Sequence, residues 1–176
     1  RQSDEAMHRS VGVIKKAYEE FKEIFGRGDP SPFVEEYMTE DADIIIVGMG
    51  TLALPVRVAV RRFQEAGRKI GFVRVKFFRP FPTEELQEIL TKCKAVCVVD
   101  RDYSYGAPSY GGVLFTELRS ALYPMEKRPL MLNFIAGLGG REIHVNDVND
   151  MVDIVQKAIE TGIIEQEATW IGVRDN

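Results

Sequence analysis

The spacing of apolar and polar residues changes near residue 30, and this change divides the chain into two parts. Between Met7 and Phe25, apolar side chains recur at steps of four and three residues, which places them on one stripe of a helix. Gly26 opens the segment GRGDPSP, which is rich in residues that end helices. Residues 1–32 are therefore expected to form an N-terminal helix and a linker.

Beyond residue 40, continuous apolar runs alternate with amphipathic stretches. Four runs are typical of strands buried on both faces of a sheet: DADIIIVGMG, KIGFVRVKFF, KAVCVVD and RPLMLNFIAGLGG. The stretches after these runs have helical spacing, and a weaker alternation at residues 33–40 predicts one more short strand. This order predicts βαβ units, in which a mostly parallel sheet is covered by helices on both faces. Residues 33–162 are expected to form this α/β domain, and residues 163–176, which lack periodicity, a C-terminal tail.

Composition and charge restrict the class of protein. The chain of 176 residues is 45% hydrophobic, so it has enough apolar side chains for a folded core. Its 23 basic and 27 acidic residues give a net charge of −4, whereas a general nucleic-acid binder needs a basic face. No apolar run approaches the roughly 18 residues of a membrane span. We therefore expect a cytoplasmic protein without nucleic-acid or membrane partners and, because the chain begins with Arg1 rather than Met, a piece of a longer protein.

The turn after the first buried run fits a nucleotide-binding pattern. Residues Gly48–Ala53 match G-x-G-x-x-[GA] between a strand and a helix, where the pyrophosphate of a dinucleotide binds. Such a site also needs an acidic residue at the end of the second strand, but the sequence there is Lys76-Phe77-Phe78-Arg79. A tight strand-to-helix turn requires glycine even without a phosphate. Both interpretations stay open, and the basic residues disfavour the nucleotide.

The loop after the third buried run, Asp100–Gly106, is a candidate contact surface. It lies at the carboxyl end of a strand, where open parallel sheets bind ligands or partners. Tyrosine and arginine are favoured in the cores of interfaces. The residues concerned are Asp100, Arg101, Asp102, Tyr103 and Tyr105. The alternative is an Asp–Arg pair that orders the loop and caps a helix beginning near Tyr110.

A second candidate loop, Gly137–Glu142, follows the fourth buried run. Gly137, Gly139 and Gly140 allow unusual backbone angles or the close approach of another backbone. Exposed N–H groups there would suit an anion, with Arg141 adding charge, and a sharp turn before a helix is the alternative. Because the ends of parallel strands meet at one edge, we expect both loops to lie together and form a subunit contact.

No set of residues in the sequence forms a complete active site. His8 and His144 are far apart in the chain. Cys93 and Cys97 supply neither a disulfide framework nor a four-thiolate metal site. We therefore expect this chain to contribute no catalytic, cofactor-binding or metal-binding residue.

Five segments, in a fixed order, carry a resemblance to a known family. They are EEYMTEDADIIIVGMGT, FVRVKFFRPFP, VVDRDYSYG, GVLFTELRSALY and FIAGLGGREI. Over roughly residues 4–162, the chain resembles the C-terminal part of the alpha subunit of pyruvate:ferredoxin oxidoreductase, also called pyruvate synthase, and of related 2-oxoacid:ferredoxin oxidoreductases. One departure is that Gly106–Gly112 is longer than the compact glycine loop of the family, which affects the expected partner contact.

The resemblance implies a fold similar to the transketolase C-terminal domain. Such a fold has three α/β/α layers and a mostly parallel, five-stranded sheet, preceded here by the N-terminal helix. One edge strand of the sheet is antiparallel to its neighbour. In this chain the segment VEEYMTE would be that strand.

The resemblance also implies a function. The holoenzyme would convert a 2-oxoacid such as pyruvate to acyl-CoA by oxidative decarboxylation, using thiamine diphosphate, Mg²⁺, iron–sulfur clusters and coenzyme A, and would reduce ferredoxin. This chain would be an assembly domain that binds other subunits or domains of the oxidoreductase and is inactive alone. Two alternatives stay open: a stand-alone nucleotide-binding module, and the last domain of another thiamine enzyme, such as a transketolase or a 2-oxoacid dehydrogenase beta subunit.

Overall fold

A computed structural model describes residues 1–107 and 110–173 of the chain. Among these residues the sheet has six strands, in the order β1-β3-β2-β4-β5-β6. Their bounds are Val34–Tyr37 for β1, Ile44–Met49 for β2, Ile70–Val75 for β3, Ala95–Asp100 for β4, Leu130–Ile135 for β5 and Ala168–Trp170 for β6. The helices are Gln2–Phe25 (α1), Ala53–Glu65 (α2), Thr83–Leu90 (α3), Val113–Leu122 (α4) and Val145–Thr161 (α5), with single 3₁₀ turns at Gly50–Leu52 (η1) and Leu138–Gly140 (η2).

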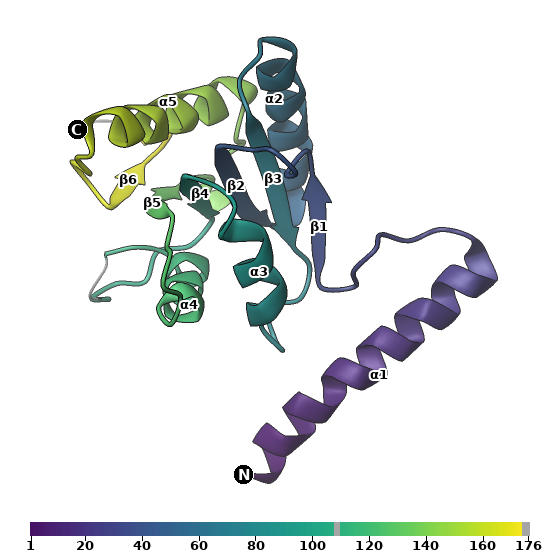
Figure 1. Cartoon of the computed structure of the whole chain (residues 1–176). Helices are drawn as coiled ribbons and strands as arrows, with labels where there is room; N and C mark the ends of the chain where they lie inside the picture. The colour runs from purple at the N-terminus through teal and green to yellow at the C-terminus, as the bar shows by residue number, and fades with distance from the viewer. Residues whose placement is uncertain (108–109, 174–176) are drawn as a thin grey trace.

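The domain has the three layers that the sequence predicts, with helices on both faces of the sheet (Figure 1). Side chains of β2 alternate between the two cores: Ile44 and Ile46 pack with α2 and α5, whereas Ile45 and Val47 pack with α3 and α4. All four of these residues are completely buried. A strand that is apolar on both faces needs such cover on both sides, which explains why the sequence shows continuous rather than alternating apolar runs.

The directions of the strands also agree with the prediction, but the number of strands does not. β2, β3, β4 and β5 are parallel, and the edge strand β1 is antiparallel to β3. The expected count of five strands is wrong, because β6 forms within the predicted tail and pairs in parallel with β5. Backbone hydrogen bonds hold it there, from the N–H of Asn133 to the carbonyl of Glu167 (2.7 Å) and from the N–H of Ile171 to the carbonyl of Ile135 (2.9 Å).

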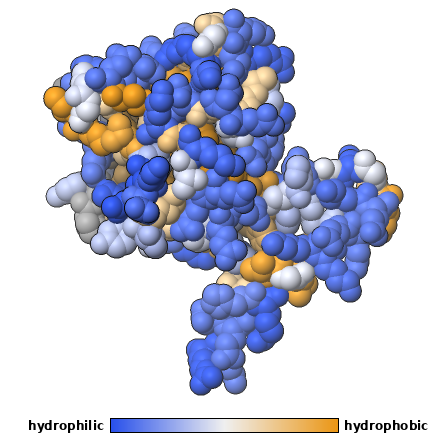
Figure 2. Space-filling model, in the orientation of Figure 1, coloured by the Kyte–Doolittle hydropathy of each residue, from blue (hydrophilic) through white to orange (hydrophobic). Residues whose placement is uncertain are grey.

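α1 stands apart from the three layers (Figure 1), and the space-filling view shows it as a separate lobe joined to the domain through apolar side chains (Figure 2). It ends at Gly26, which has a left-handed conformation with φ 62°. Val11 and Ile14 pack partly against the core beneath α3 and α4. The N–H of Asp29 donates to the hydroxyl of Tyr18 (2.8 Å), which fixes the end of the helix to the linker. In the part of the chain that the structure describes, no helix combines the length and the apolar character needed to span a membrane.

Candidate functional site at the carboxyl edge of the sheet

The loops that follow β2, β4 and β5 meet at the carboxyl edge of the sheet, as the parallel topology requires. Arg101 joins them. One of its guanidinium nitrogens donates to the hydroxyl of Thr51 (2.8 Å), and another reaches the carbonyl of Gly137 at 3.5 Å. The structure therefore confirms that the two candidate loops lie together.

Two aspartates, one at the end of β4 and one just after it, hold the start of α4. The carboxylate of Asp100 accepts hydrogen bonds from the N–H groups of Leu114 (2.9 Å) and Phe115 (3.2 Å), and that of Asp102 accepts one from the N–H of Val113 (3.0 Å). These bonds satisfy N–H groups that have no partner inside the helix. The alternative of a capped helix is thus correct in part, but the helix begins at Val113 instead of near Tyr110.

Asp100 itself faces inward. Only 3% of the residue is exposed, and Nδ2 of Asn133 donates to its Oδ2 at 2.8 Å. Burial raises the pKa of the Asp100 carboxyl to about 7, with the nearby Asp102 charge acting in the same direction. The N–H donors around Asp100 act in the opposite direction because they favour the charged form. Its side chain is committed to contacts within this chain.

An aromatic cluster lies at the same edge. The rings of Tyr103 and Tyr105 meet edge to face at 5.0 Å between centroids, and the ring of Trp170 lies 4.7 Å from that of Tyr103. Tyr105 is 85% exposed. The sequence pattern did not point to Trp170, because this residue lies in the tail, which lacks periodicity. The one signal that could have drawn attention to it is that it is the only tryptophan of the chain.

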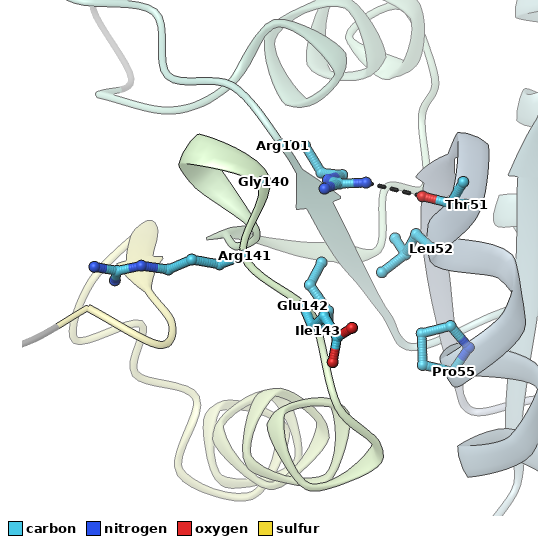
Figure 3. A pocket seen from close by; sticks show the side chains of 8 residues that line it. All are labelled: Thr51, Leu52, Pro55, Arg101, Gly140, Arg141, Glu142 and Ile143. Atoms are coloured by element: carbon cyan, nitrogen blue, oxygen red, sulfur yellow. Dashed lines mark hydrogen bonds between the residues drawn. The ribbon is translucent and has the colours of Figure 1, made fainter.

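The glycine loop takes conformations that favour glycine. The φ angles of Gly137, Gly139 and Gly140 are 74°, 65° and 81°. An added Cβ on Gly139 or Gly140 would meet open space, so the backbone there is accessible to another chain. The guanidinium of Arg141 extends away from Arg101 and donates to the carbonyl of Gly172 (Figure 3).

Two hollows flank the bond between Arg101 and Thr51, and both residues line each hollow. The hollow in Figure 3, of about 240 Å³, lies between the start of α2 and the glycine loop and is also lined by Glu142. The second, of about 600 Å³, is more apolar, with Phe78 and Val113 among its walls. The edge thus offers recesses of two kinds to a partner.

The turn at Gly48–Ala53 has a structural reason for its glycines. A Cβ on Gly48 would overlap the side chain of Leu52, so glycine allows β2 to pack against the following turn. Gly50 has a φ of 65°. At the end of β3, Lys76 pairs with Asp29 in the linker, with 2.8 Å between Nζ and Oδ2. These contacts explain the glycines of the turn and the lysine at the end of β3, and none of them requires a bound nucleotide.

Cys93 and Cys97 lie in different cores, one on each side of the sheet. Burial raises the pKa of the Cys93 thiol to about 12 and that of Cys97 above its ordinary range. Across residues 1–107 and 110–173, no group of three or more His, Cys, Asp or Glu side chains is arranged to hold a metal ion.

Comparison with known protein families shows which family the chain matches. Residues 42–148 match the family described as pyruvate:ferredoxin oxidoreductase core domain II. The chain belongs to this family. As a member of the core domain II family, it contains the strands β2 to β5 and the helices between them within the matched region.

Curated relatives of this core domain II protein carry two names. The chain is 44% identical over 158 residues to ketoisovalerate oxidoreductase subunit VorA of Pyrococcus abyssi, covering 90% of this chain and 39% of the relative. It is 40% identical over 170 residues to pyruvate synthase subunit PorA of Pyrococcus furiosus, covering 97% of this chain and 42% of the relative. The chain therefore spans about two fifths of the length of these relatives.

A solved structure confirms the transketolase-like fold that was expected. A split gene transketolase, described as an inactive beta4 tetramer, matches with a TM-score of 0.52 at 20% identity, over 72% of this chain and 41% of the transketolase. At that identity the likeness concerns the fold alone.

Proposed function

We propose that this chain is the assembly domain of the alpha subunit of a 2-oxoacid:ferredoxin oxidoreductase. The complete enzyme would oxidatively decarboxylate a 2-oxoacid such as pyruvate to acyl-CoA and pass the electrons to ferredoxin. The family match is the observation that carries this proposal. It favours this enzyme over a transketolase or a 2-oxoacid dehydrogenase beta subunit, because the transketolase likeness concerns the fold alone.

The two cysteines of this chain do not fit the iron–sulfur clusters of such an enzyme. Iron–sulfur clusters are held by several cysteine thiolates, whereas Cys93 and Cys97 are buried on opposite sides of the sheet. We further propose that thiamine diphosphate, Mg²⁺, the clusters and coenzyme A are held by other subunits or domains of the complete enzyme. The contribution of this chain would be to position those parts relative to one another.

The carboxyl edge is the surface that we assign to this contact. Its exposed residues are of the types that contribute most to interfaces: Arg101, Tyr105, Arg141 and, in addition to the sequence candidates, Trp170. The half-buried Tyr103 lies between the rings of Tyr105 and Trp170. The exposed backbone of Gly139 and Gly140 provides a thin surface for close approach, whereas Gly137 is buried beneath Arg101 and Ile143. Asp100 and Asp102 would act indirectly, since they hold the loop in place.

Truncation of Tyr105 in the complete complex tests this assignment. Tyr105→Ala should weaken assembly by about tenfold or more, because exposed aromatic residues are frequent hot spots. Tyr123→Ala is the matched control, since Tyr123 is 75% exposed but lies at the other end of α4. Equal assembly of both variants and the wild type, measured by sedimentation of the purified complex, would rule out this edge as the contact.

The activity is tested separately. The complete complex should reduce a viologen dye with pyruvate or another 2-oxoacid and coenzyme A, whereas the purified chain alone should not. Turnover by the chain alone would contradict the assembly role, and a complex that reduces no dye with any 2-oxoacid would contradict the enzyme class.

A further inference from the structure

Lys76, directly after β3, holds a positive charge where α1, the linker and the domain meet. Its side chain is only 17% exposed. Its Nζ donates to Oδ2 of Asp29 at 2.8 Å and to the carbonyl of Ser31 at 2.6 Å, and the hydroxyl of Tyr18 lies 3.5 Å away. A lysine ammonium has three N–H donors, so these three oxygens account for all of them.

None of these three oxygens belongs to the α/β domain that carries the lysine. Tyr18 lies in α1, and Asp29 and Ser31 lie in the linker. Removing a charge from water costs free energy, and apolar residues of similar volume often stabilise a fold as well as a buried ion pair does. The best-attested use of such pairs is to select one arrangement among several. The arrangement that Lys76 can select is the direction of α1 relative to the domain.

The linker folds back on the end of α1, so the two form one piece. The N–H of Asp29 donates to the hydroxyl of Tyr18 at 2.8 Å. Gly28 has a φ of 146°, and a Cβ there would lie 2.7 Å from Cγ of Lys22 in the last turn of the helix. Lys76 therefore attaches the end of the helix and the linker together to the end of β3.

The first half of α1 has much less support (Figure 1). No residue of the helix is buried, and Val11 and Ile14 pack only partly against the core. A hollow of about 360 Å³ lies between residues 4–15 and the loop 79–85. A helix of 24 residues is about 36 Å long, so a rotation of about 10° at its attached end would move the other end by about 6 Å. The direction of α1 thus depends on the contacts at its C-terminal end.

We propose that Lys76 is a positioning residue that fixes the direction in which α1 leaves the domain. In the oxidoreductase proposed above, this direction would determine how the domain is oriented relative to the rest of the subunit. That consequence rests on the proposed function, whereas the direction of α1 is measured on the chain itself. Lys76→Met isolates the role, because methionine keeps the apolar stem and removes all three donors.

Double electron–electron resonance measures the direction of α1. Nitroxide labels on Arg9→Cys in α1 and Leu54→Cys in α2 report one distance between the helix and the domain, since both positions are exposed and the native cysteines are buried. The distance distribution should be narrow with Lys76 and at least about twice as wide in Lys76→Met, because the helix then samples several directions. Lys76→Arg keeps the charge and should stay narrower than Lys76→Met. An unchanged width in Lys76→Met, or equal widths in both variants, would overturn the proposal.

Lys94→Met is the matched control. Lys94 also pairs with an aspartate, with 3.1 Å between its Nζ and Oδ1 of Asp43, but it lies before β4, at the opposite edge of the sheet. Its loss should leave the distance distribution as narrow as that of the wild type. Equal broadening in Lys94→Met and Lys76→Met would mean that the loss of any ion pair loosens the chain, and would contradict a specific role for Lys76.

Trypsin cleavage after Arg27 gives a second measurement. Arg27 is exposed in the linker, and cleavage there requires the linker to leave the end of α1. Because cleavage follows the population of the open form, it should be about fivefold or more faster in Lys76→Met. If Lys76→Met fails to fold, Asp29→Ala, which changes only the linker, should show the same faster cleavage and the same broadening. Equal cleavage rates in the wild type and the folded variant would overturn the proposal.

Discussion

The side chains of Asn133 and Asp100 are hydrogen-bonded to each other inside the domain, with Nδ2 of Asn133 donating to Oδ2 of Asp100 at 2.8 Å. The same Asn133 donates to the carbonyl of Val98 and accepts from the N–H of Gly112. This pair therefore connects β4, β5 and the residue that precedes α4. Because its polar atoms are paired and removed from water, the network fixes the position of the loop that carries Arg101.

The stability of the domain should depend on pH through Asp100. The pKa of this carboxyl rises from 3.8 to about 7 on folding, chiefly because of burial. Between these values the folded state holds a proton that the unfolded state has lost, so stability falls as the pH rises from about 4 to 7 and then levels off. The size of this effect is at most about 4 kcal/mol, since each pKa unit corresponds to about 1.4 kcal/mol.

Chemical denaturation of the wild type and Asp100→Asn at several pH values measures this effect. The advantage of the wild type over the variant should shrink as the pH rises through this range, because the amide does not titrate. An advantage that grows with pH would mean that the N–H donors of Leu114 and Phe115 outweigh burial and that the carboxylate is charged in the folded protein.

A methyl group should be tolerated very differently at two glycines of the carboxyl edge. Gly112→Ala would overlap the carboxyl group of Asp100, so we expect a loss of about 3 kcal/mol or more in the free energy of unfolding. Gly139→Ala has open space around the new Cβ but a φ of 65°, and should cost about 1 kcal/mol through backbone strain. Urea denaturation compares them, and equal losses would contradict the close contact at Gly112.

Replacement of Arg101 should affect assembly more than folding. Arg101→Ala removes the bond to Thr51, but Arg101 is exposed, so the isolated chain should lose only about 1 kcal/mol of stability. Assembly of the complete complex should weaken by about 2 kcal/mol or more if its guanidinium is buried against a charged partner. Melting of the chain and assembly of the complex are measured side by side. A variant chain that melts much earlier while the complex assembles normally would make Arg101 a structural residue.

NADH and NADPH should not bind at the turn Gly48–Ala53. The end of β3 offers Lys76 where a ribose would need an acidic residue, and Lys76 is already paired with Asp29. Isothermal titration calorimetry with both nucleotides should detect no binding. Micromolar affinity for either would restore the alternative of a nucleotide-binding module.

Most of the fold could be predicted from the sequence because its central strands are buried on both faces. IIIV in β2 and VCVV in β4 are continuous apolar runs, which leave little choice other than a parallel sheet between helices. β6 could not be found in this way. It has only three residues, all partly exposed or exposed, and is defined by its pairing with β5 instead of by a pattern of its own.

The site was predictable in position but not in detail. The topology alone places the loops after β4 and β5 at one edge, and the structure agrees. The different environments of Asp100 and Asp102 depend on strand geometry. Asp100 follows Val96 and Val98 at steps of two, so it faces the core shared with α4, whereas Asp102 lies beyond the strand. That alternation was the signal for a buried aspartate.

Because β6 lies near the C-terminal end of the chain, a C-terminal truncation would remove it. A version that stops at Gly162, where the last helix ends, would remove the partners of the Asn133 N–H and the Ile135 carbonyl. β5 would then become a bare edge strand containing Phe134 and Ile135, open to pairing with the same strand of another molecule. Aggregation of such a shortened protein would reflect the lost edge strand and not a failure of the α/β core.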